Sequence, residues 1–269
     1  MSKNIEISPH DPNWQNIFAV EETNIKYALG DDCIIVYHIG STSVPGLAAK
    51  PKVDIIAAVK DLSFQTSQLE AMGYRDRGGF NIPLRRTFTI KTLNKNINLH
   101  IFEENDPEIE LNILFRDYLR MHPHAKDEYA QLKYELVAKE SSHKKYSPFY
   151  KNYTLGKHDF IQNILNQTGF DKLRFVLCTH DQEWDSARYF RNKYFFGLYN
   201  VNDPYTWTFD HPDHKHLILY RGTKIIGYAH IQLWLDRRAA IRIIVIDEIQ
   251  RNNNYGGKFL RLCEKWLKS

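Results

Sequence analysis

The sequence predicts a two-domain protein of the α+β / α/β class, in which each domain has a mixed sheet with helices. The chain has 269 residues, which is enough for two domains of ordinary size. Short β-branched runs alternate along it with longer amphipathic runs, and this indicates strands mixed with helices. A polar stretch that ends in glycine, residues 166–169, separates two such regions. We therefore expect domains at 1–168 and 169–269.

The first domain is expected to begin with an amphipathic helix, because Ile17, Phe18, Ile25 and Leu29 recur at roughly helical spacing. A β-branched strand follows directly. The complete expectation is strands at 33–39, 53–59, 86–91 and 97–102, and helices at 12–29, 63–72, 108–121, 124–139 and 156–165.

The second domain is expected to begin again with a strand and a helical stretch. Two later strands are joined by residues 221–224, whose Gly-Thr pair is typical of a hairpin turn. The complete expectation is strands at 173–178, 216–220, 225–234 and 240–246, and helices at 181–196 and 255–268.

Composition limits the class of protein. Hydrophobic residues at 43% and charged residues at 25% are typical of globular chains. The net charge of +4 suits an anionic small molecule as well as RNA, and we do not expect a nucleic-acid partner from it. The chain has neither a signal-peptide pattern at its start nor an apolar run of membrane-spanning length. We expect a soluble, cytoplasmic protein with no membrane partner.

Cysteines and histidines give no metal-binding pattern. Cys33, Cys178 and Cys263 are widely spaced in apolar or amphipathic runs, so we expect buried free thiols in a reducing compartment. Among the 12 histidines, three cluster at residues 211–216. We expect a solvated polar loop there rather than a metal site.

A first candidate site lies between the strands at 33–39 and 53–59. A Gly40-Ser41 turn lets backbone N–H groups approach phosphate oxygens, and the serine hydroxyl adds a donor. Asp54 on the second strand is a carboxylate that can hold Mg²⁺. Nucleotidyl transfer requires both features.

These residues belong to a longer signature, HIGSTSVPGLAAKPKVD, at residues 38–54. With the runs at 99–103, 115–123 and 129–133, it resembles the GrpB (UPF0157) family, which is similar to polymerase-β-type nucleotidyltransferases, over roughly residues 5–165. The resemblance implies a nucleotidyltransferase-like mixed sheet with helices. It also implies phosphate or nucleotide contacts at Gly40, Ser41, Lys50 and His100, and a catalytic, Mg²⁺-binding role with nucleotide for Asp54; Glu103 shares the strand of His100.

One departure from the superfamily pattern keeps several interpretations open. A second carboxylate is expected two residues after Asp54, and Ile56 stands there. The domain is therefore a transferase, a nucleotide or anion binder on a catalytic scaffold, or a domain in which the motif has only a structural role. The pairs Arg85–Arg86 and Arg116–Arg120 line an anionic cleft or belong to a solvated face.

A second candidate site follows the strand at 240–246. A polar, glycine-bearing loop leads there into a helix, whose free N–H groups and dipole favour a pyrophosphate. Arg251 and Gly256 match the ends of the acetyl-CoA motif of GNAT acetyltransferases, which this half resembles, and Asn254 replaces the first glycine. The implied fold is a GNAT-like mixed sheet domain.

The GNAT resemblance implies roles for particular residues. Pantetheine would pair with Ile244, Val245 and Ile246. Asp247 or Glu248 would be the catalytic base, and Tyr228, His230 and Trp234 would line an acceptor cleft or serve only in packing. Acetyl-CoA would be held at Arg251, Asn252, Asn254, Tyr255, Gly256 and Gly257.

A GNAT fold continues beyond the helix at 255–268, so the resemblance implies a partial, C-terminally incomplete domain. The strand at 240–246 would then be an open edge, and we expect a homodimer through the C-terminal half.

Three hypotheses for function follow. The first is an acetyl-CoA-dependent N-acetyltransferase, acting on a small-molecule or amine acceptor, fused to a nucleotide- or phosphate-binding domain. The second is an Mg²⁺-dependent nucleotidyltransferase in the first half. The third is a non-catalytic nucleotide- or CoA-binding module.

Overall fold

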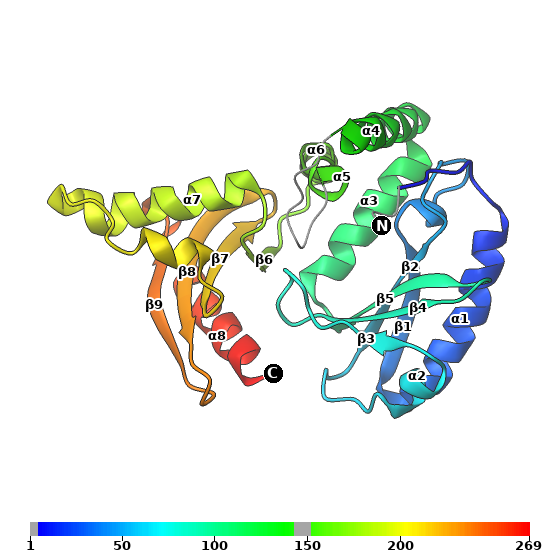
Figure 1. Cartoon of the computed structure of the whole chain (residues 1–269), viewed down its shortest axis with the longest axis horizontal. Helices are drawn as coiled ribbons and strands as arrows, with labels where there is room; N and C mark the ends of the chain where they lie inside the picture. The colour runs from blue at the N-terminus through cyan, green and yellow to red at the C-terminus, as the bar shows by residue number, and fades with distance from the viewer. Residues whose placement is uncertain (1–4, 143–151) are drawn as a thin grey trace. The chain divides into compact units, whose positions relative to one another are not determined.

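The computed structural model describes residues 5–142 and 152–269 (Figure 1). The chain separates into two compact units. The first comprises residues 1–80 and 85–170, and the second comprises Asn81–Leu84 and Asp171–Ser269.

The first unit is built on a five-stranded mixed sheet with the order β1-β2-β5-β4-β3. Strands β2 and β5 are parallel, and the other pairs are antiparallel. Its strands are β1 (Cys33–Ile39), β2 (Val53–Val59), β3 (Arg75–Asp76), β4 (Arg86–Lys91) and β5 (Asn96–Glu103). Its α-helices are α1 (Asn13–Leu29), α2 (Ser67–Ala71), α3 (Pro107–Met121), α4 (Pro123–Ser142), α5 (Asn152–Leu155) and α6 (His158–Gln167).

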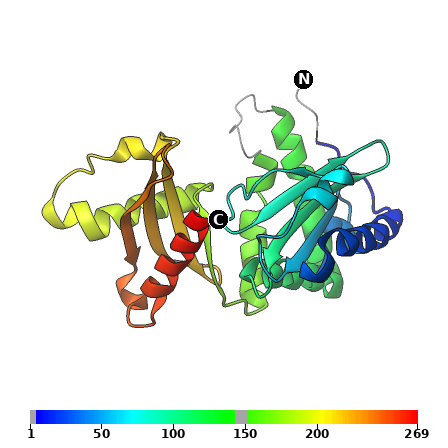
Figure 2. The same ribbon diagram turned by 90° about the horizontal axis from the view of Figure 1, so that it is seen from below.

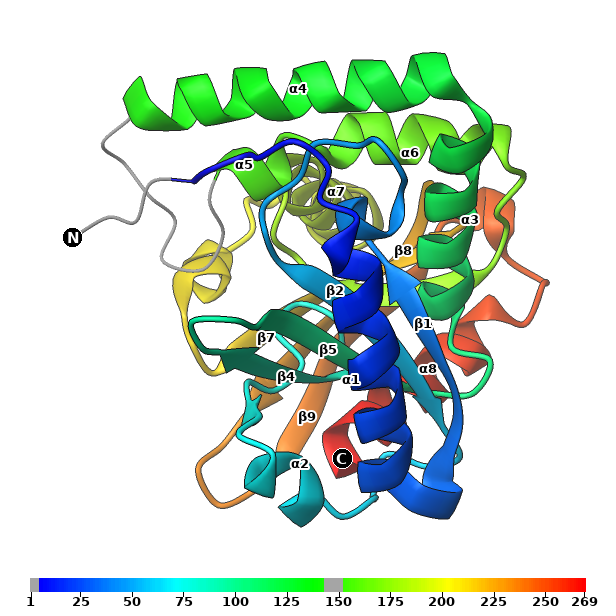
Figure 3. The same cartoon turned by 90° about the vertical axis from the view of Figure 1, so that its right-hand side faces the viewer.

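The two faces of this sheet have different partners. Helix α1 lies across one face (Figure 3), where the core contains the odd-numbered residues of β2 and β5, such as Ile55 and Leu99. Because successive strand residues point to opposite faces, the even-numbered residues, Asp54 and Asn98 among them, belong to the other face. The predicted site residues of these strands therefore share the face away from α1.

The second unit has a four-stranded antiparallel sheet in the order β6-β7-β8-β9. Helices α7 and α8 cover opposite faces of it (Figures 1 and 2), and each face has its own apolar cluster. Its elements are β6 (Leu173–Leu177), α7 (Asp181–Arg191), β7 (His214–Arg221), β8 (Lys224–Leu233), β9 (Ala239–Ile246) and α8 (Tyr255–Lys268).

Two local irregularities shape this unit. Helix α7 continues as a π-helical stretch, Asn192–Phe196. In β9, His230 of β8 faces Ile243 while the next residue, Ile231, faces Ile241, so Arg242 is the extra residue of a β-bulge. Both irregularities lie beside the pocket described below.

The predicted fold class is confirmed: the chain has a nucleotidyltransferase-like mixed sheet with helices, followed by a second sheet domain consistent with GNAT proteins. The described strands of the second sheet are all antiparallel, so this sheet is not mixed as expected. Three local expectations were wrong. The helix expected at 63–72 is limited to Ser67–Ala71, and Cys33 is only half-buried. His214 and His216 are not in a solvated loop; they belong to β7, where His216 is buried.

Within the described ranges, no helix combines the length and the apolar character that crossing a membrane requires.

Candidate functional site

Asp54 and the Gly40 turn meet at the end of β2. Gly40 has φ +70°, and a Cβ added to it would lie 2.8 Å from Oδ2 of Asp54. The positive φ and the close carboxylate both require glycine here. Asn98, the neighbour of Asp54 on β5, donates a hydrogen bond of 2.8 Å to it. The turn and the carboxylate predicted from sequence are therefore brought together.

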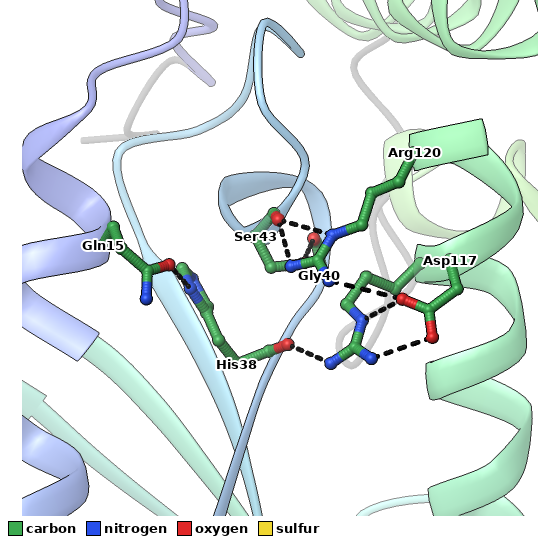
Figure 4. Close-up of polar contacts among 7 residues, drawn as sticks. Gln15, His38, Gly40, Ser43, Asp117 and Arg120 are labelled. Carbon is green, nitrogen blue, oxygen red and sulfur yellow. Dashed lines mark hydrogen bonds and ion pairs between the residues drawn. The ribbon is translucent and has the colours of Figure 1, made fainter. Parts of the chain in front are cut away.

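Two arginines of α3 hold the turn in place (Figure 4). Arg116 donates to the carbonyl oxygen of His38 at 3.0 Å, and Arg120 donates to that of Ser43 at 2.7 Å. Asp117 pairs with both guanidinium groups. These arginines therefore bind the backbone of the turn, which answers the question left open by the sequence.

Lysines surround the carboxylate. Lys50, Lys52 and Lys157 act electrostatically on Asp54 and oppose the rise in its pKa that burial causes.

Lys133, almost fully buried, donates to Oγ of Ser41 at 3.2 Å and to the carbonyl oxygen of Ala48. Burial, with a smaller effect of Lys157, lowers the pKa of Lys133 to about 7.

This lysine cluster (Lys50, Lys52, Lys133 and Lys157) also includes cation–π contacts. The Nζ atoms of Lys50 and Lys157 lie 3.7 Å and 4.7 Å from the centre of the Tyr153 ring. Burial lowers the pKa of Lys157 as well, against the attraction of Asp54. The ammonium groups of Lys133 and Lys157 are thus buried beside a carboxylate that is itself buried, an arrangement that an anionic ligand would stabilise.

The site does not fit a Mg²⁺ ion. Among the described residues, no group of three or more His, Cys, Asp and Glu side chains gathers where it could hold a metal. Ile56, at the position of the second carboxylate, is fully buried, and its neighbour on β5 is His100. Burial, with smaller effects of Arg85 and Lys52, lowers the pKa of His100 to about 3, so the ring is neutral. Its nitrogen atoms are poor ligands for a hard cation, which prefers oxygen. Glu103 lies farther along β5, opposite Val59.

In the second unit, β9 leads through a short loop into α8. Asn252 and Asn254 have φ of +67° and +57°, the left-handed conformation that asparagine tolerates best. No side chain caps the first turn of α8 at Asn254. The N–H groups of Tyr255, Gly256 and Gly257 therefore begin the helix without an intrahelical acceptor. This is the arrangement expected for a bound pyrophosphate.

The other predicted residues of this half lie around the end of β9. Ile244 and Ile246 pack toward α8 and Val245 toward α7, while their strand forms the edge of the described sheet. Arg251 donates to the carbonyl oxygen of Ile246 at 3.4 Å. The main chain of β9 is thus open on one side next to the predicted cofactor loop.

The two candidate bases are held by other contacts. Asp247 accepts from the hydroxyl of Tyr194 at 3.2 Å and from the N–H of Ile249 at 3.0 Å. Glu248 pairs with Lys193 at 2.8 Å. Neither carboxylate lines the pocket of this unit, and their catalytic role stays a prediction.

A pocket of about 790 Å³ opens on the α7 side of the sheet. This volume is within the range of small-molecule sites. His230 lines it, Tyr228 lies buried behind it, and Trp234 lines a smaller neighbouring pocket. Six aromatic side chains form much of the wall: Tyr194, Phe195, Phe196, Tyr199, Tyr205 and Trp207.

Arg191 organises the polar floor of this pocket. It is 1% exposed and makes two hydrogen bonds to Asp203, at 2.5 Å and 2.8 Å. Its NH1 group also donates to Nδ1 of His230 at 3.2 Å. On the other side, Nε2 of His230 lies 2.7 Å from Nδ1 of His214. Burial lowers the pKa of His230 to about 3, so these rings are neutral near pH 7.

Sequence reasoning missed this floor. The loop expected at 211–216 includes His214 and overlaps the expected strand at His216, its first residue, whereas β7 begins at His214. The alternation His-x-His is itself a period-two signal, and His216 is the direct partner of His230 across the sheet. The lysine cluster was also only partly expected. Lys133 lies four residues after the buried Tyr129 on α4, the spacing that places two side chains on one helix face.

The two units thus define a class: a nucleotidyltransferase-like domain joined to an acetyltransferase-like domain. Sequence comparison agrees. The chain belongs to the GrpB family, whose model, described as GrpB protein, matches residues 4–167. The model of the acetyltransferase (GNAT) family matches residues 180–269.

Individual relatives match the first part of the chain. The UPF0157 protein YqkA of Bacillus subtilis is 37% identical over 139 residues, which are 51% of this chain and 40% of that protein. A UPF0157 protein of Halalkalibacterium halodurans is 38% identical over 143 residues, 51% of this chain and 71% of that protein. The chain therefore spans less than half of the length of YqkA.

One solved structure supports the fold of the first unit. The conserved protein GrpB from Enterococcus faecalis has a TM-score of 0.54 and 30% sequence identity with this chain. The match covers 61% of this chain and 96% of that structure.

Proposed function

We propose that the second unit is an acetyl-CoA-dependent N-acetyltransferase that modifies an amine. The observation that carries the proposal is the sequence of elements at its edge. An open strand, β9, leads into a loop with two left-handed asparagines and then into the uncapped start of α8. Residues 244–246 would pair with pantetheine, and Arg251, Asn252, Asn254, Tyr255, Gly256 and Gly257 would hold the pyrophosphate.

When bound, acetyl-CoA would supply an activated acetyl thioester. The protein has two tasks beside it. The pocket on the α7 side of the sheet would orient the amine acceptor against its aromatic wall. Backbone N–H groups along the open edge of β9 polarise the carbonyl under attack, and Asp247 or Glu248 stays the predicted base.

The test uses Gly256, at the start of α8. In Gly256→Glu the new carboxylate interacts favourably with the helix dipole but repels a pyrophosphate. Gly256→Gln introduces a side chain of the same size without the charge. An added Cβ meets only Ile246, at 3.7 Å, so both variants should fold. We expect acetyl-CoA to raise the melting temperature of the natural protein and of Gly256→Gln, and not that of Gly256→Glu. Equal shifts in the two variants would contradict the proposed cofactor site.

We also infer that the first unit binds a phosphorylated ligand, such as a nucleotide, through lysines and not through Mg²⁺. The lysine cluster beside Ser41 supports this second function, because its buried ammonium groups have lowered pKa values and would gain from an anion. This favours a binder over an Mg²⁺-dependent transferase.

Calorimetric titration with pyrophosphate tests this function. We expect pyrophosphate to bind in EDTA, with no requirement for Mg²⁺, and a loss of at least tenfold in Lys157→Met. The matched control is Lys60→Met, since Lys60 is an exposed lysine at the end of β2. Binding that appears only with Mg²⁺ would argue for a metal-dependent transferase.

The predicted homodimer through the C-terminal half is a further proposal, supported by the exposed edge of β9. Sedimentation equilibrium should give twice the chain mass of 31.8 kDa at micromolar concentration. A mass of one chain would count against it.

A further inference from the structure

The chemistry of the second unit's pocket limits what it can bind. Arginine can only donate hydrogen bonds. Since Arg191 donates to Nδ1 of His230, that nitrogen carries no proton. The neutral ring of His230 therefore has its proton on Nε2 and donates it to Nδ1 of His214. His214, neutral in turn, must carry its own proton on Nε2.

The opposite arrangement is excluded by the same arginine. If His214 donated from Nδ1, Nε2 of His230 would have to accept, and the remaining proton of His230 would point at Arg191. Asp203 holds Arg191 by two hydrogen bonds, so the guanidinium has little freedom to turn away. Arg191 thus sets the direction of this series of hydrogen bonds: Arg191 donates to His230, and His230 donates to His214.

A second series of hydrogen bonds, which also begins at Arg191, has the same direction: the NH1 group of Arg191 donates to the hydroxyl of Tyr228 at 3.5 Å. Nε2 of His216 lies 3.0 Å from the carbonyl oxygen of Thr208, which can only accept. Nδ1 of His216 therefore accepts from the hydroxyl of Tyr228, at 2.7 Å. All three rings are expected to be the Nε2–H tautomer.

The polar groups of the pocket that remain available to a ligand are hydrogen-bond donors. Within the described structure, Nε2 of His214 has no hydrogen-bond partner. Oε1 of Gln232 is occupied by Arg242, at 2.6 Å and 2.9 Å, so its amide N–H groups remain. The bulge places Arg242 itself on the lining.

Carboxylates are absent from the described lining of this pocket, whereas Asp213 and Asp236 line the smaller neighbouring pocket. The charge of Arg191 is neutralised by Asp203. Arg242 therefore gives the lining a net positive charge, whereas a polyamine would need carboxylates. Trp207, Tyr205 and Tyr199 at the wall are 54%, 52% and 78% exposed, so flat apolar surface is available to a ligand.

We propose that this pocket binds an aromatic molecule through a carboxylate, which accepts hydrogen bonds from His214, Gln232 and Arg242 while the ring lies among the aromatic side chains. This inference rests on the proposed acetyltransferase function in one respect: it makes the acyl acceptor an aromatic amine that bears a carboxylate.

The test is calorimetric titration of the full chain, without acetyl-CoA, with 4-aminobenzoate, benzylamine and spermidine. We expect 4-aminobenzoate to bind at least tenfold more tightly than either cation. Arg242→Gln should lose about tenfold in affinity for 4-aminobenzoate. Arg238→Gln is the matched control, because Arg238 is an exposed arginine of the same hairpin that does not line the pocket. Tighter binding of benzylamine or spermidine, or equal losses in the two variants, would overturn the proposal.

A spectroscopic measurement tests the hydrogen-bond argument without any ligand. Long-range ¹H–¹⁵N spectra of histidine-labelled protein at pH 7 should show His214, His216 and His230 as Nε2–H tautomers. An Nδ1–H tautomer at His214 would overturn the proposal, because the pocket would then offer an acceptor.

Separate measurements of acetyl-CoA binding and 4-aminobenzoate binding distinguish a failure of this inference from a failure of the proposed function. A chain that binds acetyl-CoA but not 4-aminobenzoate contradicts only the inference about the acceptor. A chain that binds 4-aminobenzoate but not acetyl-CoA supports the pocket chemistry and contradicts the proposed acetyltransferase.

Discussion

Both units bury charged side chains, but the charges are balanced differently in the two. Around Asp54, burial opposes the positive charges of Lys133 and Lys157. Around Arg191, the charge of the guanidinium group is neutralised by Asp203, and the histidines beyond it are neutral. The first site has buried ammonium groups that an anionic ligand would stabilise, and the second has a fixed direction of hydrogen bonds that a ligand must match.

The largest loss of unfolding free energy is expected when the ion pair between Arg191 and Asp203 is broken. Arg191→Met leaves Asp203 without its partner and removes the donor to His230, so we expect the second unit to lose about 3–5 kcal/mol of unfolding free energy. Urea unfolding followed by hydrogen exchange in each unit measures it. Arg188→Met, in an exposed pair with Asp185, should change stability by less than about 0.5 kcal/mol. Similar losses in both variants would show that burial of the pair is unimportant.

A smaller effect is expected at the turn of the first site. Gly40→Ala meets both a positive φ and the carboxylate of Asp54, whereas Gly78→Ala meets a positive φ with open space around it. The left-handed backbone costs about 1–2 kcal/mol in each. We expect Gly40→Ala to lose about 1–3 kcal/mol more from overpacking, and to lose pyrophosphate binding. Equal unfolding free energies would mean that Asp54 can move aside freely.

A third prediction concerns the pH dependence that Lys133 causes. Its pKa is lowered to about 7 in the folded protein, so between pH 7 and about 10.4 the unfolded chain binds more protons, and stability rises with pH in that window. Pyrophosphate binding should change in the opposite sense and weaken above pH 7, because it needs the protonated ammonium group. Thermal melts and titrations from pH 6 to 10 measure both trends. In Lys133→Met the binding affinity should depend less on pH, and an unchanged profile would assign the titration to another group.

Sequence reasoning predicted most of the first site, because its turn and carboxylate lie on two consecutive strands joined by a short signature. Gly40, Ser41 and Asp54 indeed meet. It predicted Lys50 but not Lys133 or Lys157, which reach the site from α4 and from the turn before α6. The run at 129–133 and the four-residue spacing from Tyr129 place Lys133 on a helix face, but the meeting of that face with the turn before α6 is a tertiary property that no local pattern shows.

In the second unit, the start of α8 was predicted from the strand, loop and helix pattern. The pocket was not, because it depends on pairing across β7 and β8 and on a bulge in β9. Strand alternation assigns a face, but it cannot show that a one-residue irregularity turns Arg242 toward that face.

The π-helical stretch at the end of α7 has a consequence for how this pocket could change. Tyr194, Phe195 and Phe196 are consecutive, yet all three line it. In a regular α-helix, successive side chains diverge by about 100°, so three neighbours would not share one wall. A π turn corresponds to one additional residue in a helix. Deletion of a single residue there would restore the α-helical repeat and turn part of the aromatic wall away, so a minimal change of chain length could exchange one ligand preference for another.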